Sequence, residues 1–191
     1  MMTKNRLEAF SDGVLAIIIT IMVLEIKVPH GDSFRDLAQL YPKFLSYILS
    51  FLYIAIYWNN HHHLMHTVTK VKSGVLWSNM LLLFSLSLVP FSTAWLGENN
   101  FACHPMIFYG FTLLLSAISY WILTQQIIKV DPENSILKKA IGVDIKGKIS
   151  IVIYLIGIIS AFYINWIAPI CYMLVALLWL IPDKRIEKVL S

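Results

Sequence analysis

Charged residues are scarce in this sequence. They make up 14% of its 191 residues, whereas 58% are hydrophobic, and the mean hydropathy is +0.71. Soluble domains are usually about a quarter charged and about half apolar, so the composition predicts a protein whose solvent is a lipid bilayer. Lysine and arginine outnumber aspartate and glutamate by 15 to 11. No run of basic residues forms a nucleic-acid patch, so no nucleic-acid partner is expected.

Cysteine is scarce too, with two residues in the sequence. Cys103 falls in an expected loop and Cys171 in an apolar run, which excludes a disulfide framework and a cysteine-based metal site. The first apolar segment does not read as a cleavable signal peptide. The "EIKVPHGDS" behind it has no small-residue cleavage site, and Asp12 lies where such a peptide is apolar. We therefore expect this segment to be retained.

The apolar residues gather into six segments of suitable length to cross a bilayer, which takes about 20 helical residues. The segments cover residues 9–28, 43–67, 75–96, 105–129, 147–164 and 166–182. They predict an all-α membrane protein in which residues 1–191 form one six-span domain.

The basic residues are unevenly divided between the two sides of this arrangement. Twelve of the 15 lie on the side that holds both termini, and the other three are Lys27, Arg35 and Lys43. Because lysine and arginine near span ends are enriched on the cytoplasmic side, we expect a multi-pass protein of the cell membrane with both termini in the cytoplasm.

The first segment, "RLEAFSDGVLAIIITIMVLEIK", combines a regular apolar stripe with a misplaced charge. Four of its residues follow the i, i+3, i+4, i+7 pattern of one helix face: Ile17, Thr20, Ile21 and Leu24. Asp12 lies about 130° around the helix from the centre of this stripe. If the stripe lines a pore, Asp12 faces neighbouring helices. The alternative is that Ser11 and Asp12 only cap the helix N-terminus.

The second segment ends in the polar run "WNNHHH". Trp58, His61 and His62 share one helix face through their i, i+3, i+4 spacing, and Asn79 of the third segment is a suitable hydrogen-bond partner. His66 forms an i,i+4 pair with His62, which is a spacing able to share a metal ion. No cysteine or carboxylate converges with this pair in the sequence, so interhelical hydrogen bonding is favoured. Further along the third segment, Pro90 is expected to bend the helix near its outer end.

These motifs resemble those of a known family. Arg6-x-x-x-Phe10-Ser11-Asp12-Gly13, "WNNHH" at 58–62 and "LWSNMLLLFSLSLVPF" at 76–91 resemble the first three spans of the lysosomal potassium channel family, transmembrane protein 175, and its bacterial relatives. Animal members carry two six-span repeats. This chain has a single FSDG motif and resembles the bacterial form, which assembles as a homotetramer.

The resemblance implies a potassium-selective cation channel in a lipid bilayer, with the first helix of each subunit lining the pore and no cofactor besides the permeant potassium ions. It places the constriction at Ile17, with later pore layers at Thr20 or Ile21 and at Leu24, and potassium ions near Ile17 and Thr20. It also implies a structural polar network that holds the pore helix: Arg6, Phe10, Ser11, Asp12, Gly13, Trp58, His61, His62 and Asn79. Three consecutive histidines leave the choice among His61, His62 and His63 open. In this network Asp12 is the anchor that fixes the rotation of the helix, and Gly13 permits close helix approach.

Two familiar channel devices are missing from the sequence. There is no TVGYG-like segment for a carbonyl filter and no arginine-rich helix for a voltage sensor. A ring of isoleucine side chains gates by dewetting, and we expect such a filter to select modestly and to leak protons. The main alternative is a proton- or metal-coupled secondary transporter that uses Asp12 and the histidines of the second segment. An enzyme is not expected, because no serine or cysteine nucleophile accompanies the histidines and Asp12.

Overall fold

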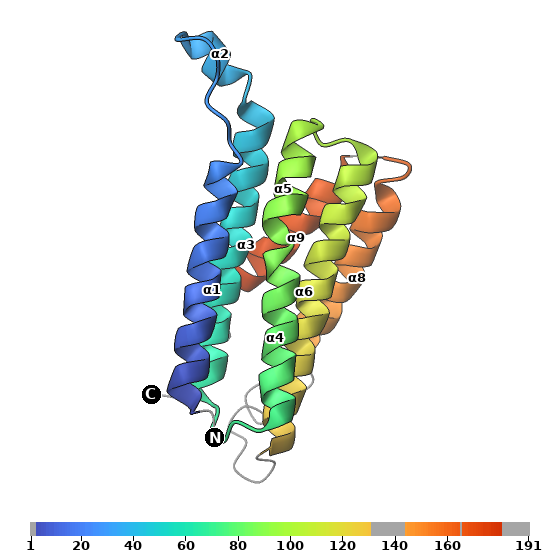
Figure 1. The fold of residues 1–191 in the computed structure, drawn as a ribbon. Helices are drawn as coiled ribbons and strands as arrows, with labels where there is room; N and C mark the ends of the chain where they lie inside the picture. The colour runs from blue at the N-terminus through green and yellow to red at the C-terminus, as the bar shows by residue number, and fades with distance from the viewer. Residues whose placement is uncertain (1–2, 131–143, 165, 181–191) are drawn as a thin grey trace.

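The computed structural model describes residues 3–130, 144–164 and 166–180 and is shown in Figure 1. All regular elements in these ranges are α-helices, which confirms the all-α prediction for this part of the chain. The helices are α1 Lys4–Leu24, α2 Phe34–Ala38, α3 Tyr41–His66, α4 Ser73–Ser87, α5 Val89–Glu98, α6 Cys103–Val130, α8 Ile145–Ser160 and α9 Ile167–Leu180.

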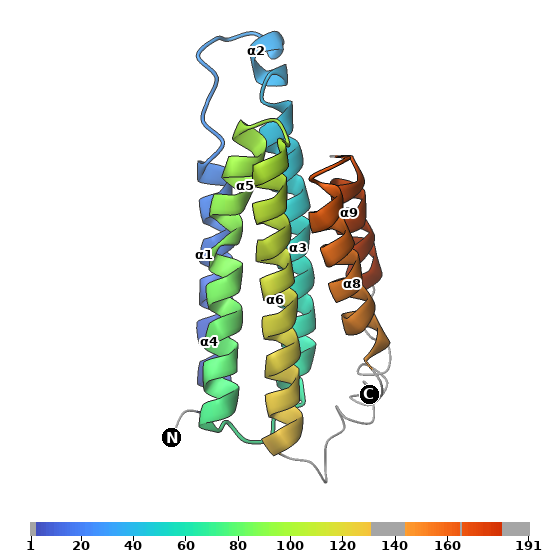
Figure 2. The same cartoon turned by 90° about the vertical axis from the view of Figure 1, so that its right-hand side faces the viewer.

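The long helices run up and down beside one another, and α8 and α9 form a shorter hairpin on one side (Figures 1 and 2). Each of the six predicted segments coincides with a helix or, for the third, with the pair α4 and α5. Within the described ranges, three stretches are both long and apolar enough to cross a membrane: α1, residues 73–98 and α6. Helix α9 is apolar but shorter. The prediction that both termini lie in the cytoplasm concerns the ends of the chain and its last basic residues, and these lie outside the described residues.

Helix α1 begins earlier than the sequence predicted. It starts at Lys4, so Ser11 and Asp12 lie about two turns inside it. The interpretation that these two residues cap the helix is therefore wrong. The physical reason is that the residues from Lys4 to Ala9 contain no helix breaker, and the helix continues through them into the apolar segment.

The third predicted segment is interrupted near its outer end. Helix α4 ends at Ser87 and α5 begins at Val89, with Pro90 in the first turn of α5. Proline has no backbone N–H and clashes with the preceding turn, which accounts for the break. The position agrees with the bend that Pro90 predicted.

The connection between α1 and α3 contains an element that the sequence analysis did not predict. Helix α2 projects from the bundle at the end where α1 finishes (Figures 1 and 2). Ser33 and Asp36 form a capping box at its N-terminus, in which each side chain accepts from the other residue's backbone N–H. This local motif nucleates one short helix in an otherwise polar loop.

The buried apolar residues form two separate cores. The first core joins α1, α3, α4 and the end of α6, and its members include Leu15, Ile18, Met22, Leu64, Leu82 and Leu123. The second core joins the other half of α3 to α5, α6, α8 and α9, and its members include Tyr53, Tyr109, Tyr154, Tyr172, Leu113 and Val175. Helices α3 and α6 contribute to both cores and connect the two halves of the bundle.

Candidate pore helix and its polar contacts

The two faces of α1 have opposite environments. One face packs into the first core, where Leu15, Ile18 and Met22 are 1–4% exposed. The opposite face carries the predicted stripe and is uncovered. Its apolar members are 58% exposed at Ile17, 42% at Ile21 and 77% at Leu24. Thr20 lies among them and is also exposed.

Thr20 presents an oxygen on this open face. Its hydroxyl donates back to the helix, to the carbonyl of Ile17 at 2.9 Å and that of Ala16 at 3.1 Å. Because the hydroxyl hydrogen is used by the backbone, the lone pairs of Oγ1 are the part left to interact with a cation. Thr20 therefore offers an acceptor within an otherwise apolar stripe.

A buried chain of hydrogen bonds joins α1 to α4 and α3. Asn79 donates from Nδ2 to Ser11 Oγ at 2.9 Å, and Ser11 donates to the carbonyl of Leu7 at 2.8 Å. On its other side, Asn79 Oδ1 lies 2.8 Å from His61 Nε2. An amide oxygen can only accept, so His61 carries its proton on Nε2. Ser11, Asn79 and His61 are all at most 1% exposed, and the two bonds of Asn79 fix the rotation of α1 and of α3 against α4.

Asp12 contacts α3 through a single hydrogen bond. Trp58 donates from Nε1 to Asp12 Oδ1 at 3.0 Å. Asp12 is half-buried and Trp58 is 46% exposed, so this contact lies at the rim of the helix interface and not within the core. Ser11, and not Asp12, is the fully buried member of the FSDG motif.

Arg6 and Gly13 do not take the positions that the sequence suggested within a single chain. Arg6 is exposed and makes no ion pair with Asp12 among the described residues. Six residues along a helix place two side chains about 120° apart around its axis, which explains their separation. A Cβ atom added at Gly13 would meet nothing within 4 Å, so none of the described helices approaches it closely. Phe10 is 48% exposed.

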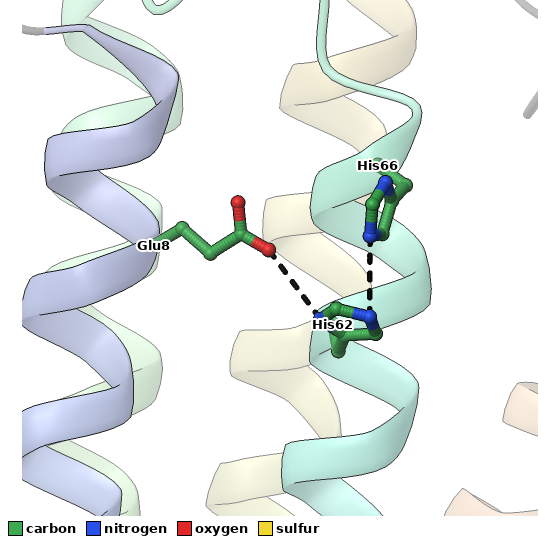
Figure 3. Close-up of side chains that lie close together, drawn as sticks. All are labelled: Glu8, His62 and His66. Carbon is green, nitrogen blue, oxygen red and sulfur yellow. Dashed lines mark hydrogen bonds and ion pairs between the residues drawn. The ribbon is translucent and has the colours of Figure 1, made fainter.

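A second charged contact lies one turn before Asp12. Glu8 Oε1 is 3.4 Å from His62 Nδ1, and His62 Nε2 is 3.1 Å from His66 Nε2, as Figure 3 shows. No carboxylate converges with these histidines along the sequence, but the structure brings Glu8 to them. The missed signal was the matched spacing on two neighbouring helices that run in opposite directions. Glu8 and Asp12 are four residues apart, and so are their respective partners, His62 and Trp58.

The structure thus separates the three consecutive histidines. His61 turns toward Asn79 on α4, whereas His62 turns toward Glu8 on α1. The ring of His63 contacts the ring of His62 at a centroid distance of 5.7 Å.

An apolar groove adjoins the exposed stripe. It lies between α1 and the α4–α5 break and is lined by Val14, Ile17, Ile21, Ser87, Pro90 and Phe91, among others. The groove extends the uncovered apolar surface of α1 onto a second helix. Such a continuous apolar surface is typical of an interface with protein or lipid.

Comparison with known proteins gives consistent matches. Residues 6–90 match the family model described as endosomal/lysosomal potassium channel TMEM175. A protein of Chryseobacterium sp. (strain P1-3) named as a potassium channel is 58% identical, over 100% of this chain and 99% of its own length. A protein of Streptomyces collinus, also named as a potassium channel, is 41% identical over 51% of this chain and 50% of its own length.

A solved structure shares the fold as well. The crystal structure of a lysosomal potassium-selective channel TMEM175 homologue from Chamaesiphon minutus has a TM-score of 0.78 and 29% sequence identity. The similarity covers 93% of this chain and 96% of that one.

Proposed function

The chain is a bacterial member of the TMEM175 family, and we propose that it is a potassium channel whose conduit is lined by α1. Relatives from two bacterial genera and a solved homologue all carry potassium-channel names. The observation that supports the role of α1 is its uncovered stripe, in which Thr20 stands among exposed apolar residues on the face opposite the core.

The proposal requires several copies of the chain. One helix cannot enclose a conduit, and identical subunits close most simply into a ring around a symmetry axis. We propose a homotetramer in which the four α1 stripes face the axis and the groove beside α5 accepts a neighbouring subunit. Gly13 and Arg6, which have no close partner helix or ion pair among the described residues, then lie where subunits can meet.

Ion passage follows from the side chains on the stripe. Four copies of Ile17 form a narrow apolar ring that excludes water when it closes. One turn further along α1, four Thr20 oxygens replace part of the hydration shell of a potassium ion. The contacts of Ser11 with Asn79 and of Asp12 with Trp58 hold α1 at the rotation that keeps these residues on one side.

The membrane arrangement that accompanies this function has six spans, with both termini in the cytoplasm of the cell. It is supported by the agreement of the six predicted segments with helices of the structure and by the uneven division of basic residues. The transporter alternative has no support among the relatives, which are named as channels. Neither a catalytic activity nor a cofactor besides the permeant ion is proposed.

Currents from purified protein in planar bilayers under a potassium–sodium gradient test the function. We expect potassium-selective currents from the wild type. Ile17→Asn hydrates the constriction, so it should raise the current and weaken discrimination of potassium over sodium.

Ile18→Asn is the matched control, because the same amide one residue away enters the first core, where Ile18 is 4% exposed. It should lower the yield of folded protein without changing selectivity. If Ile17→Asn leaves both current and selectivity unchanged, α1 does not line the conduit. If the wild type carries no current at all, the channel function itself is wrong.

A further inference from the structure

Glu8, His62 and His66 bring three metal-ligating side chains together at one end of the α1–α3 interface (Figure 3). One ligand atom from each residue lies within 4.8 Å of the others. We propose that this triad binds a divalent transition-metal ion of the zinc type. The site is separate from the exposed stripe of α1 and goes beyond the proposed conduction.

The spacing of the two histidines already fits a metal ion. His62 and His66 are four residues apart on α3, so their side chains lie on the same helix face. Their Nε2 atoms are 3.1 Å apart. Two nitrogens bound to one tetrahedral zinc at its usual bond lengths are about 3.3 Å apart. A metal ion can therefore take the place of the hydrogen bond between the two rings with little movement.

Glu8 supplies the third ligand from the facing helix. Its Oε1 lies 3.4 Å from His62 Nδ1, whereas His66 faces Nε2 of the same ring. To join an ion held between the two Nε2 atoms, the carboxylate would rotate about its own side-chain bonds. Two imidazoles and a carboxylate form the ligand set of many zinc sites that keep one position for water. Potassium, magnesium and calcium prefer oxygen ligands, so this donor set selects against the permeant ion.

Access and local charge set the affinity of the site. The side chains of Glu8 and His62 are 20% and 41% exposed, and His66 is exposed, so an ion and its water can enter. Lys4 donates from Nζ to the carbonyl of His66 at 3.1 Å. Its ammonium group opposes cation binding and lowers the affinity.

A bound ion would connect α1 to α3 one turn from the contact between Asp12 and Trp58. Together with the contact between Asp12 and Trp58, it would hold α1, which carries the exposed stripe, in place against α3. This consequence concerns the position of α1 and does not depend on which ion the protein conducts.

The test is metal binding by the full chain in detergent, with any affinity tag removed and bound metal stripped by a chelator. Zn²⁺ is titrated by calorimetry, and Co²⁺ serves as a spectroscopic probe of tetrahedral coordination. We expect one ion per wild-type chain. His66→Ala should weaken binding at least about 10-fold. Even the loss of a residue that only supports a metal ligand usually weakens binding by about this factor. His104→Ala, at an exposed position on α6, is the matched control and should bind like the wild type.

His66→Ala is expected to fold, because its side chain is exposed and only its backbone carbonyl accepts from Lys4. Glu8→Gln provides a second variant that keeps the size of the side chain and removes its charge, and it should also weaken binding. The proposal is wrong if the wild type binds neither metal, or if His66→Ala and Glu8→Gln both retain wild-type affinity. It is also wrong if His104→Ala removes binding. Each of these results leaves the measured currents, and so the proposed channel function, untouched.

Discussion

The two cores of this bundle use buried polar groups differently. In the first core, an amide, an imidazole and a hydroxyl form one chain that ties α1 to α4 and α3. In the second core, four buried tyrosines gather around α9. The Tyr53 hydroxyl donates to the backbone carbonyl of Tyr172, and the Tyr154 hydroxyl donates to Tyr53 at 3.3 Å.

The tyrosine cluster leaves little free space. A Cβ atom at Gly110 would lie 2.0 Å from the Tyr172 hydroxyl, and one at Gly157 would lie 2.6 Å from the same ring. Only glycine at these two positions lets Tyr172 enter between α6 and α8. The surroundings of Tyr172 therefore resemble a close-packed protein interior, in which volume changes are poorly tolerated.

The difference indicates a division of labour between the halves. The buried share of α1 is 28% over its most apolar stretch, against 56% for residues 73–98 and for α6. Helix α1 packs one face into the first core, adds a few directional contacts there and keeps its opposite face open, whereas α6, α8 and α9 are joined mainly by packing. The family model matches residues 6–90, which contain α1 from Arg6 onward together with its polar partners on α3 and α4. The part of the chain that carries α1 and its polar contacts is thus also the part that carries the family's recognisable pattern.

The largest effect on stability is expected in the second half. Tyr172→Ala removes a fully buried ring and leaves a cavity that the two glycines cannot fill, which should cost about 3–5 kcal/mol, as for other buried aromatic side chains. Thermal unfolding in detergent measures the change. Tyr163→Ala is the control, because Tyr163 is 84% exposed. Equal stability of the two variants would show that the cluster is not a rigid core.

A smaller effect is expected from the polar chain of the first half. Asn79→Ala leaves the buried His61 N–H without an acceptor and removes the donor to Ser11, which should cost about 1–3 kcal/mol. It should also release the rotation of α1 and reduce potassium selectivity in bilayer recordings. Asn99→Ala, which removes only an exposed local bond to Trp95, should change stability by less than about 0.5 kcal/mol. If Asn79→Ala keeps its potassium selectivity, the chain of hydrogen bonds does not control the position of α1 in the pore.

The smallest effect is expected at the rim. Asp12→Asn keeps an oxygen that can accept from Trp58 and loses only the charge, so the stability of the chain should fall by less than about 1 kcal/mol. Arg6→Ala should not change it measurably, because Arg6 is exposed and makes no ion pair with Asp12 in the described part of the chain. Thermal unfolding measures the stability of the folded chain, and native mass spectrometry measures the oligomer. Loss of the oligomer with an intact chain would place the partner of Arg6 on a neighbouring subunit, and unfolding of the chain by Arg6→Ala would contradict this account of the rim.

The sequence alone determined the all-α class, the approximate positions of the helices and the stripe on α1. These features follow from periodicity and from the length of apolar runs, which are local properties of the chain. The interruption at Pro90 was predictable for the same reason, since a missing N–H acts on its own helix.

Only the tertiary structure decided which polar groups meet. Which of three adjacent histidines reaches Asn79 depends on the rotation of α3 against α4, and the approach of Glu8 to His62 depends on the relative height of α1 and α3. The gathering of tyrosines from α3, α6, α8 and α9 depends likewise on how whole helices pack. Such contacts join residues as far as 119 positions apart, and no local pattern in the sequence encodes the packing that brings them together.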